Sequence, residues 1–128
     1  MDRLFLDANV LFSAAYREES GLLQFWQLKR VVLLTSPCAI DEARRNLEEG
    51  QQRERLAQLV RTVELVHTLS VEGIPLLPPK DQPILRAAIS GKATHLITGD
   101  VRHFGKLYET RVSGVLVVTP AMYLKNQR

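Results

Sequence analysis

Short apolar runs alternate along the chain with stretches of helical periodicity. Four of these runs have the length and composition of strands, and they cover residues 4–6, 31–35, 94–98 and 115–119. The run at 31–35 consists of aliphatic and β-branched residues, which is typical of a strand covered on both faces in a parallel sheet. Residues 63–69 have a weaker strand pattern, which a short helix also fits.

Helical patterns fill the intervals between the strand-like runs. Ser36 followed by Pro37 has the form of an N-cap and a first helical residue, and Gly50 is expected to end that helix after Glu49. Residues 70–80 contain three of the six prolines and are expected to form an extended connection. Further helices are predicted from about residue 10 and over 21–29, 51–62 and 81–89, with helical turns over 103–108 and from residue 120.

This order of strands and helices predicts an α/β fold with one mostly parallel sheet between layers of helices. The chain has 128 residues, the usual size of one compact domain, so residues 1–128 are expected to form a single domain. Right-handed crossovers would place the carboxyl ends of the strands at one edge of the sheet. Ligand and metal sites of such folds usually lie at that edge.

Composition narrows the class of protein. With 45% hydrophobic and 24% charged residues, the chain has the composition of an ordinary globular protein. No apolar run approaches the roughly 18 to 20 residues of a membrane span, and the N-terminus has no targeting pattern, so a cytoplasmic protein is expected. The formal charge of +3 and the pI near 9.3 permit a polyanionic partner without requiring one. Cys38 is the one cysteine, and a buried structural thiol is expected.

Four acidic residues stand at comparable places in this pattern. Asp7 follows the first strand, Glu42 lies about two turns into the helix after the second, Asp81 begins the helix after the proline-rich connection, and Asp100 follows the strand at 94–98. If they meet at one edge, these carboxylates would repel each other unless they share protons or bind a divalent cation. No histidine or cysteine cluster accompanies them, and an oxygen-only ligand set favours Mg²⁺ or Mn²⁺ over zinc.

Each acid also has a purely structural explanation. Asp7 and Asp81 are suited to cap helices, Glu42 suits the positive end of its helix, and Asp100 suits a Gly-Asp turn. Against this, Asp7 and Asp100 interrupt apolar strand ends, where a structural role needs no charge. Asp41 is an alternative to its neighbour Glu42, although the apolar residues of this helix put Glu42 nearer to the buried boundary.

Four segments of the chain, LDANVLFSA, SPCAIDEARRNL, PPKDQPILRAAI and THLITGDVRHF, resemble the PIN domain, the ribonuclease fold of VapC-type toxins. They occur in the order and spacing of that family, and the resemblance covers nearly the whole chain. The resemblance implies a three-layer α/β/α sandwich and cleavage of RNA with one or two Mg²⁺ or Mn²⁺ ions. It implies that Asp7, Glu42, Asp81 and Asp100 occupy the family's acidic positions. It also implies an antitoxin partner and often a homodimer.

The resemblance also implies roles for polar and basic residues around the four acids. Asn9 and Thr98 match polar positions of the family and would hold the free lone pairs of the carboxylates, although Asn9 is also a common helix-start residue. His103 stands where many relatives have an acid or an asparagine, so it is either a contact to a phosphate or metal-bound water, or a surface histidine. Basic residues at the rim are candidates to bind RNA phosphates: Arg44, Arg45, Arg102, His103, Lys106 and Arg111.

Three other functions fit an α/β chain of this length. A receiver domain requires an acidic pair after the first strand and a lysine after the last, whereas this chain has Asp7-Ala8-Asn9 and Thr119-Pro120-Ala121. A phosphatase of the haloacid dehalogenase type requires a second aspartate, which is also missing from Asp7-Ala8-Asn9. The remaining alternative is an RNA-binding or protein-interaction module that keeps the fold without catalysis, and the presence of all four acids argues against it.

Overall fold

The computed structural model describes residues 1–67 and 82–126. In this part of the chain, six strands form one sheet in the order β3-β2-β1-β4-β6-β5. Neighbouring strands are parallel except for β5 and β6, which are antiparallel. The mostly parallel sheet confirms the prediction. The strands are β1 (Asp2–Leu6), β2 (Val31–Thr35), β3 (Glu64–Leu65), β4 (His95–Ile97), β5 (Arg111–Val112) and β6 (Val115–Val118).

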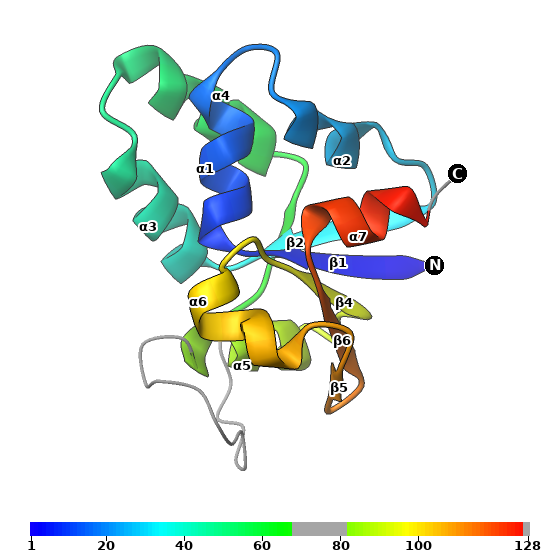
Figure 1. Ribbon diagram of the computed structural model, residues 1–128. Helices are drawn as coiled ribbons and strands as arrows, with labels where there is room; N and C mark the ends of the chain where they lie inside the picture. The colour runs from blue at the N-terminus through cyan, green and yellow to red at the C-terminus, as the bar shows by residue number, and fades with distance from the viewer. Residues whose placement is uncertain (68–81, 127–128) are drawn as a thin grey trace.

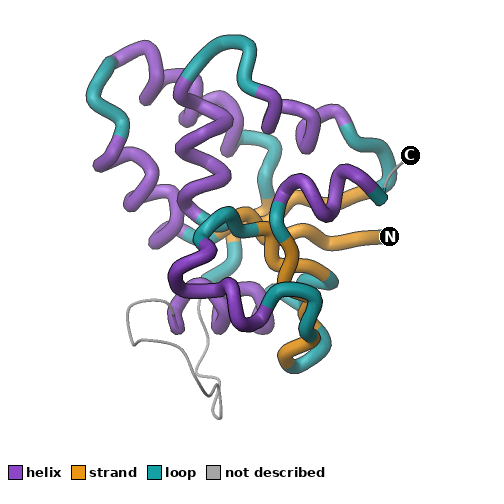
Figure 2. Tube along the Cα trace, in the orientation of Figure 1, coloured by secondary structure: helices purple, strands orange, loops and turns teal. Residues whose placement is uncertain are grey.

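Helices cover both faces of this sheet, which is the predicted three-layer arrangement. In Figure 1, α1, α2 and α4 lie on one side of the strands and α5 and α6 on the other, and Figure 2 shows the strands between them. None of the described helices is long and apolar enough to cross a membrane. The helices are α1 (Ala8–Tyr16), α2 (Gln24–Gln27), α3 (Pro37–Asn46), α4 (Gly50–Val60), α5 (Gln82–Ser90), α6 (Val101–Phe104) and α7 (Pro120–Lys125), with 3-10 turns η1 (Gly21–Leu23) and η2 (Gly105–Leu107).

The central strand β1 explains why the edge of the sheet carries polar residues. Its side chains Leu4, Phe5 and Leu6 are fully buried between the helical layers and belong to the hydrophobic core. Leu6 pairs in register with Ile97 of β4, so the next residue of each strand, Asp7 and Thr98, reaches the same edge. The register of two apolar strands therefore determines which polar side chains meet.

The α3–α4 boundary differs from the prediction. Helix α3 ends at Asn46 because Leu47, fully buried, turns into an extended conformation. Glu49 then caps α4, and its backbone N–H donates a hydrogen bond to the side-chain carbonyl of Gln52 at 3.2 Å. The prediction that Gly50 ends a helix was wrong, since Gly50 is the first residue of the next one.

Other boundaries are shorter or new. The pattern over 21–29 divides into η1 and α2, and the strand pattern over 63–69 yields only the two residues of β3. Strand β5 was not predicted, and it joins β6 through a turn in which Ser113 and Gly114 have positive φ values of 49° and 87°. The proline-rich connection over 70–80 and Asp81 lie outside the described residues.

Helix α4 holds the end of α1 in place. The guanidinium of Arg55 donates to the carbonyls of Ala15 and Tyr16 at 3.0 and 3.1 Å, and Gln52 donates to Tyr16 at 3.2 Å. These bonds satisfy carbonyl groups that are otherwise left free at a helix C-terminus. Helix α1, which begins beside Asp7, is thereby fixed at both ends.

Candidate active site

A pocket of about 680 Å³ lies where β1, α1 and the start of α6 meet. Three of the predicted acids line it, and each comes from a different part of the chain. Asp7 follows β1, Glu42 lies on α3, and Asp100 follows β4. The described residues that line the pocket are Asp7, Ala8, Asn9, Phe12, Cys38, Glu42, Arg45, Asn46, Ile84, Asp100 and His103.

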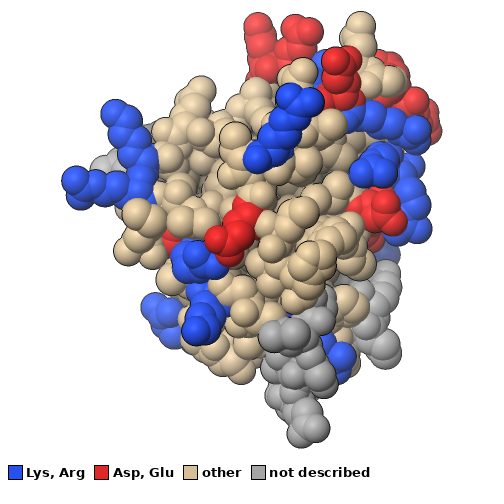
Figure 3. Space-filling view, turned by 180° about the vertical axis from the view of Figure 1, so that it is seen from behind, with Lys and Arg blue, Asp and Glu red and all other residues tan. Residues whose placement is uncertain are grey.

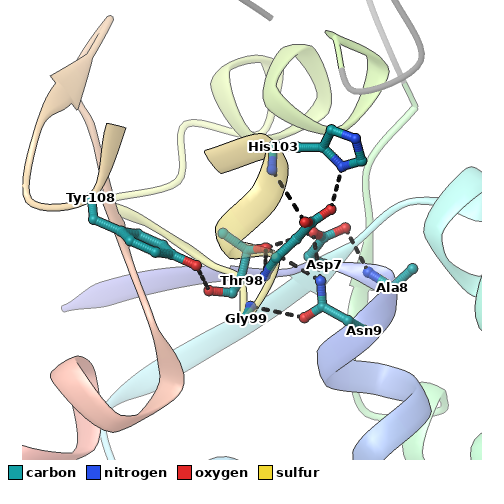
Figure 4. A network of polar contacts seen from close by, with 8 residues as sticks. Asp7, Ala8, Asn9, Thr98, Gly99, His103 and Tyr108 are labelled. Atoms are coloured by element: carbon teal, nitrogen blue, oxygen red, sulfur yellow. Dashed lines mark hydrogen bonds and ion pairs between the residues drawn. The ribbon is translucent and has the colours of Figure 1, made fainter. Parts of the chain in front are cut away.

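Asp7 is the most buried of these acids, with 4% of its surface exposed. It is the N-cap of α1, and its Oδ1 accepts a hydrogen bond from the backbone N–H of Ala8 at 2.7 Å. Its Oδ2 accepts from the Thr98 hydroxyl at 2.7 Å and from the Asn9 amide at 3.1 Å, as Figure 4 shows. Asp7 thus caps helix α1, as its structural explanation predicted, and also lies buried beside the other acids of the pocket.

Asn9 and Thr98, predicted to support the carboxylates, both contact Asp7. The Asn9 amide also donates to the Thr98 hydroxyl at 3.3 Å, while its carbonyl accepts from the backbone N–H of Gly99 at 2.9 Å. The Thr98 hydroxyl accepts from the backbone N–H of Asp100 at 3.1 Å. Thr98 therefore connects the two acids, because its hydroxyl bonds to the carboxylate of one and the backbone of the other.

Burial raises the pKa of Asp7 from its ordinary value of 3.8 to about 6. Hydrogen bonds from Thr98 and Ala8 act against this rise, and the negative charges of Glu42 and Asp100 add to it. At neutral pH this carboxylate is mostly ionised, although it is surrounded by protein and faces two other acids. A positive charge in the pocket would therefore be strongly favoured.

Asp100 is paired with His103. The Nδ1 atom of His103 lies 2.6 Å from Oδ2 of Asp100, and the backbone N–H of His103 donates to Oδ1 at 3.2 Å. Asp100 thereby caps α6, and His103 is half-buried beside it. The alternative of a plain surface histidine was wrong, because the ring is in the pocket wall and in contact with an acid.

The structure distinguishes Glu42 from its neighbour Asp41. Glu42 lines the carboxylate pocket, whereas Asp41 lies against a different hollow and has its carboxylate 4.0 Å from Arg44. Glu42 is exposed on α3, and Asp81 lies outside the described residues. Within residues 1–67 and 82–126, no three acidic, histidine or cysteine side chains are arranged closely enough to hold a metal ion.

The predicted basic residues do not all surround the pocket. Among them, Arg45 and His103 line it, while the other four do not belong to its described wall. Arg102 and Lys106 are exposed on α6 and η2, and Arg111 lies on the edge strand β5. On the face seen in Figure 3, the basic side chains of the described residues are interspersed with acidic ones and form no continuous basic surface.

Two residues of the site were not predicted from the sequence. Cys38 is exposed and lines the pocket, so the expectation of a buried thiol was wrong: in the first turn of α3, Ala39 and Ile40 point inward instead. Tyr108 donates from its hydroxyl to the carbonyl of Thr98 at 3.0 Å. Burial, followed by the charges of Asp100 and Asp7, raises the pKa of Tyr108, which keeps the hydroxyl a neutral donor. No sequence pattern marked either residue for this position.

The fold and the pocket define an α/β protein with an acidic site at the carboxyl edge of a mostly parallel sheet. The family model of the PIN domain matches residues 3–102. This chain therefore belongs to the PIN domain family, whose members are in general nucleases that use divalent metals. The resemblance inferred from the sequence is confirmed.

Solved structures contain the same fold. One similar chain comes from the crystal structure of VapBC2 from Rickettsia felis bound to a DNA fragment from their promoter. The two chains are 13% identical and superpose with a TM-score of 0.66 over 91% of this chain and 98% of the other. At this identity the likeness concerns the fold. No curated protein matches the chain.

Proposed function

We propose that this protein is an endoribonuclease that depends on Mg²⁺ or Mn²⁺ and acts as the toxin of a toxin–antitoxin pair. The observation that carries the proposal is the meeting of Asp7, Glu42 and Asp100 on one pocket. These acids come from separate elements, and the most buried one is held by three hydrogen bonds. Membership of the PIN domain family supports the reaction class.

The donor set suits a hard divalent cation. The pocket offers carboxylate oxygens, and burial together with the charges of the other acids makes an ionised Asp7 unfavourable without a counter-charge. We assign Asp7, Glu42 and Asp100 as the residues that would hold it, with Asp81 as a fourth from the sequence pattern. Because the three described acids are not close enough to form a metal site as they stand, their side chains would have to close around the ion. Such a cation would supply Lewis-acid chemistry, lowering the pKa of a water molecule and offsetting negative charge on the phosphate.

The protein's own residues position the reacting groups. Thr98, Asn9 and the Ala8 N–H fix both oxygens of Asp7, so the carboxylate needs no reorganisation when substrate binds. In hydrolysis, the oxygen of water bonds to phosphorus as the bond to one ribose oxygen breaks. The attacking water loses a proton, and the leaving ribose oxygen gains one.

Replacing Thr98 with valine is expected to lower kcat roughly ten- to 100-fold, in the range found when groups that orient metal ligands are removed. Valine keeps the shape of the buried side chain but removes the hydroxyl that bonds to Asp7 and to the N–H of Asp100. Thr98→Ser keeps the hydroxyl and should retain most activity. Titration with Mn²⁺ should show weaker binding by the valine variant, and unchanged affinity and kcat would remove Thr98 from the site.

Arg45 is the basic residue best suited to bind the phosphate of the substrate. It lies one helical turn from Glu42 on α3 and lines the same pocket, whereas Arg44 points to the hollow beside Asp41. The Nε atom of Arg45 donates to the Asp41 carbonyl at 3.4 Å, which orients the side chain along the helix. The planar guanidinium group of arginine can donate two hydrogen bonds to one phosphate group at the same time.

Arg45→Ala is therefore expected to raise KM for RNA about tenfold and to reduce the slope of log KM against log salt by about 1. Arg44→Ala is the matched control, since it removes the same charge from the same helix outside the pocket. Steady-state cleavage at several salt concentrations compares the two variants. Equal effects of both would mean that Arg45 acts only through the overall charge of the protein.

An antitoxin is proposed as the protein partner, with a homodimer as the assembly. The support is the likeness in fold to a chain of the VapBC2 structure. A polypeptide that covers the carboxylate pocket would keep RNA away from it, so toxin activity and antitoxin binding would exclude each other.

The proposed activity is tested with the purified protein and two oligonucleotides of one sequence, one RNA and one DNA. Each is incubated with Mg²⁺, with Mn²⁺ and with EDTA. Internal cleavage of the RNA that requires either cation is expected, and EDTA should stop it. RNA that stays intact under all three conditions would contradict the proposal and leave the non-catalytic alternative.

A further inference from the structure

A second hollow adjoins the carboxylate pocket. Its volume is about 920 Å³, and its walls are formed by the second half of α1, by residues 20–24 and by the start of α7, so we name it the α1–α7 hollow. Phe12 lines both this hollow and the carboxylate pocket. Gly99, which stands between Thr98 and Asp100 in the chain, also lines the α1–α7 hollow. The two hollows therefore meet at the Phe12 side chain.

One face of α1 leads from the carboxylate pocket to this hollow. Asn9, Phe12 and Tyr16 are spaced by three and four residues, so they follow one another on the same side of the helix. The rise of a helix separates Asn9 from Tyr16 by about 10 Å along its axis. The rings of Phe12 and Tyr16 are tilted by 41° with centroids 5.4 Å apart, and Tyr16 is 52% exposed. The face thus ends in an aromatic surface that is open to a ligand.

The low charge of the α1–α7 hollow suits a nucleic-acid base, which is neutral and flat although the strand that carries it is a polyanion. None of the described residues that line it is acidic, and Arg17 is its one described charged residue. Glu18 and Glu19 line a neighbouring hollow with Gln51 and Arg55, and Tyr16 and Arg17 belong to the walls of both hollows. Ser13 and Gln24 bring polar side chains to an otherwise largely apolar wall, which provides partners for the polar edge of an aromatic ligand.

We propose that the α1–α7 hollow holds an unpaired base of the RNA strand that is cleaved at the carboxylate pocket, with Tyr16 as its stacking surface. This inference rests on the proposed ribonuclease function and adds a base-binding subsite to it. A base that is paired in a duplex is stacked within the helix and has no access to a side hollow. Such a base comes from a single-stranded or looped segment, where bases are free to stack on aromatic side chains.

Measuring RNA binding without cleavage tests the base site separately from the ribonuclease activity. Anisotropy of a labelled RNA oligonucleotide is measured in EDTA, which keeps the RNA intact, for the single strand and for the same strand in a duplex. Tyr16→Ala should weaken binding of the single strand about tenfold and leave duplex binding unchanged. Tyr16→Phe keeps the ring and should bind as the wild type does. Leu65→Ala, at an exposed apolar residue on β3, is the control. Equal losses for both RNA forms, or no loss, would overturn the proposal.

A second measurement locates the base relative to the cleaved bond. Single-stranded substrates that lack one base at a time are cleaved by the wild type and by Tyr16→Ala. At one position the missing base should lower kcat/KM about tenfold for the wild type and hardly at all for the variant. If a missing base lowers kcat/KM by the same factor in the wild type and in Tyr16→Ala at every position, Tyr16 contacts no base. Absence of cleavage by the wild type would instead contradict the ribonuclease function, while Tyr16-dependent binding of the single strand would still support the base site.

Discussion

Asp7→Asn is expected to stabilise the protein at pH 7.5 in EDTA by up to roughly 3 kcal/mol, at about 1.4 kcal/mol for each unit of pKa shift. The folded state raises the pKa of Asp7 from 3.8 to about 6, so the folded protein binds the proton more tightly than the unfolded chain does. Protonated Asp7 therefore adds to the free energy of unfolding in full below pH 4, and this contribution is lost as the pH rises to 6. The asparagine variant has no charge to desolvate and should show no such loss.

Urea unfolding of both proteins from pH 4 to pH 7.5 measures this effect. The other carboxylates titrate in both proteins, so the difference between their free energies of unfolding isolates Asp7. The amide of the variant places a donor opposite the Asn9 amide, which donates to Asp7 in the wild type, and this reduces the gain. A difference that is constant over the whole pH range would mean that Asp7 is not destabilised by its surroundings.

Mn²⁺ is expected to raise the Tm of the wild type at pH 7.5 by an amount on the order of 10 °C when its concentration is 100 times Kd. A ligand that binds only the folded state stabilises it by about 2.7 kcal/mol at that ratio. The affinity itself would come from the charge of the cation, which offsets the repulsion between Asp7 and the acids Glu42 and Asp100. At pH 5 the increase should be much smaller, since most Asp7 carboxyls are then protonated and the cation must displace the proton.

Asp41→Asn is the matched control for this experiment, and Glu42→Gln is the test variant. Both remove one charge from the same helix, but only Glu42 lines the carboxylate pocket. The increase in Tm with Mn²⁺ should persist in the first variant and shrink in the second. Equal behaviour of the two variants would place the ion elsewhere.

The convergence of Asp7 and Thr98 could be predicted because it follows from two apolar strands in parallel register. Once β1 and β4 are neighbours, the residue after each strand must reach the same edge. Glu42 could be anticipated in the same way from the helical pattern of α3. Strand β2 was predicted with its observed bounds, because its run of aliphatic and β-branched residues begins after Lys29 and Arg30 and ends before Ser36 and Pro37.

The remaining features depend on contacts between distant parts of the chain. Helix α3 ends at Asn46 because Leu47 is drawn into the core, which no local pattern reveals. Cys38 is exposed because Ala39 and Ile40 occupy the inward positions, and Tyr108 reaches Thr98 across a loop. The pairing of Asp100 with His103 required atomic positions, since a spacing of three residues fits many unrelated histidines.

Asp7 is proposed to belong to the machinery that cleaves RNA. The most direct measurement is the initial rate of RNA cleavage in saturating Mn²⁺ for the wild type and for Asp7→Asn, with unfolding curves showing that both proteins are folded. The rate of the variant should fall at least about 100-fold, because the carboxylate at the centre of the pocket is lost. Equal rates for the two folded proteins would contradict the assignment of Asp7 and of the pocket around it.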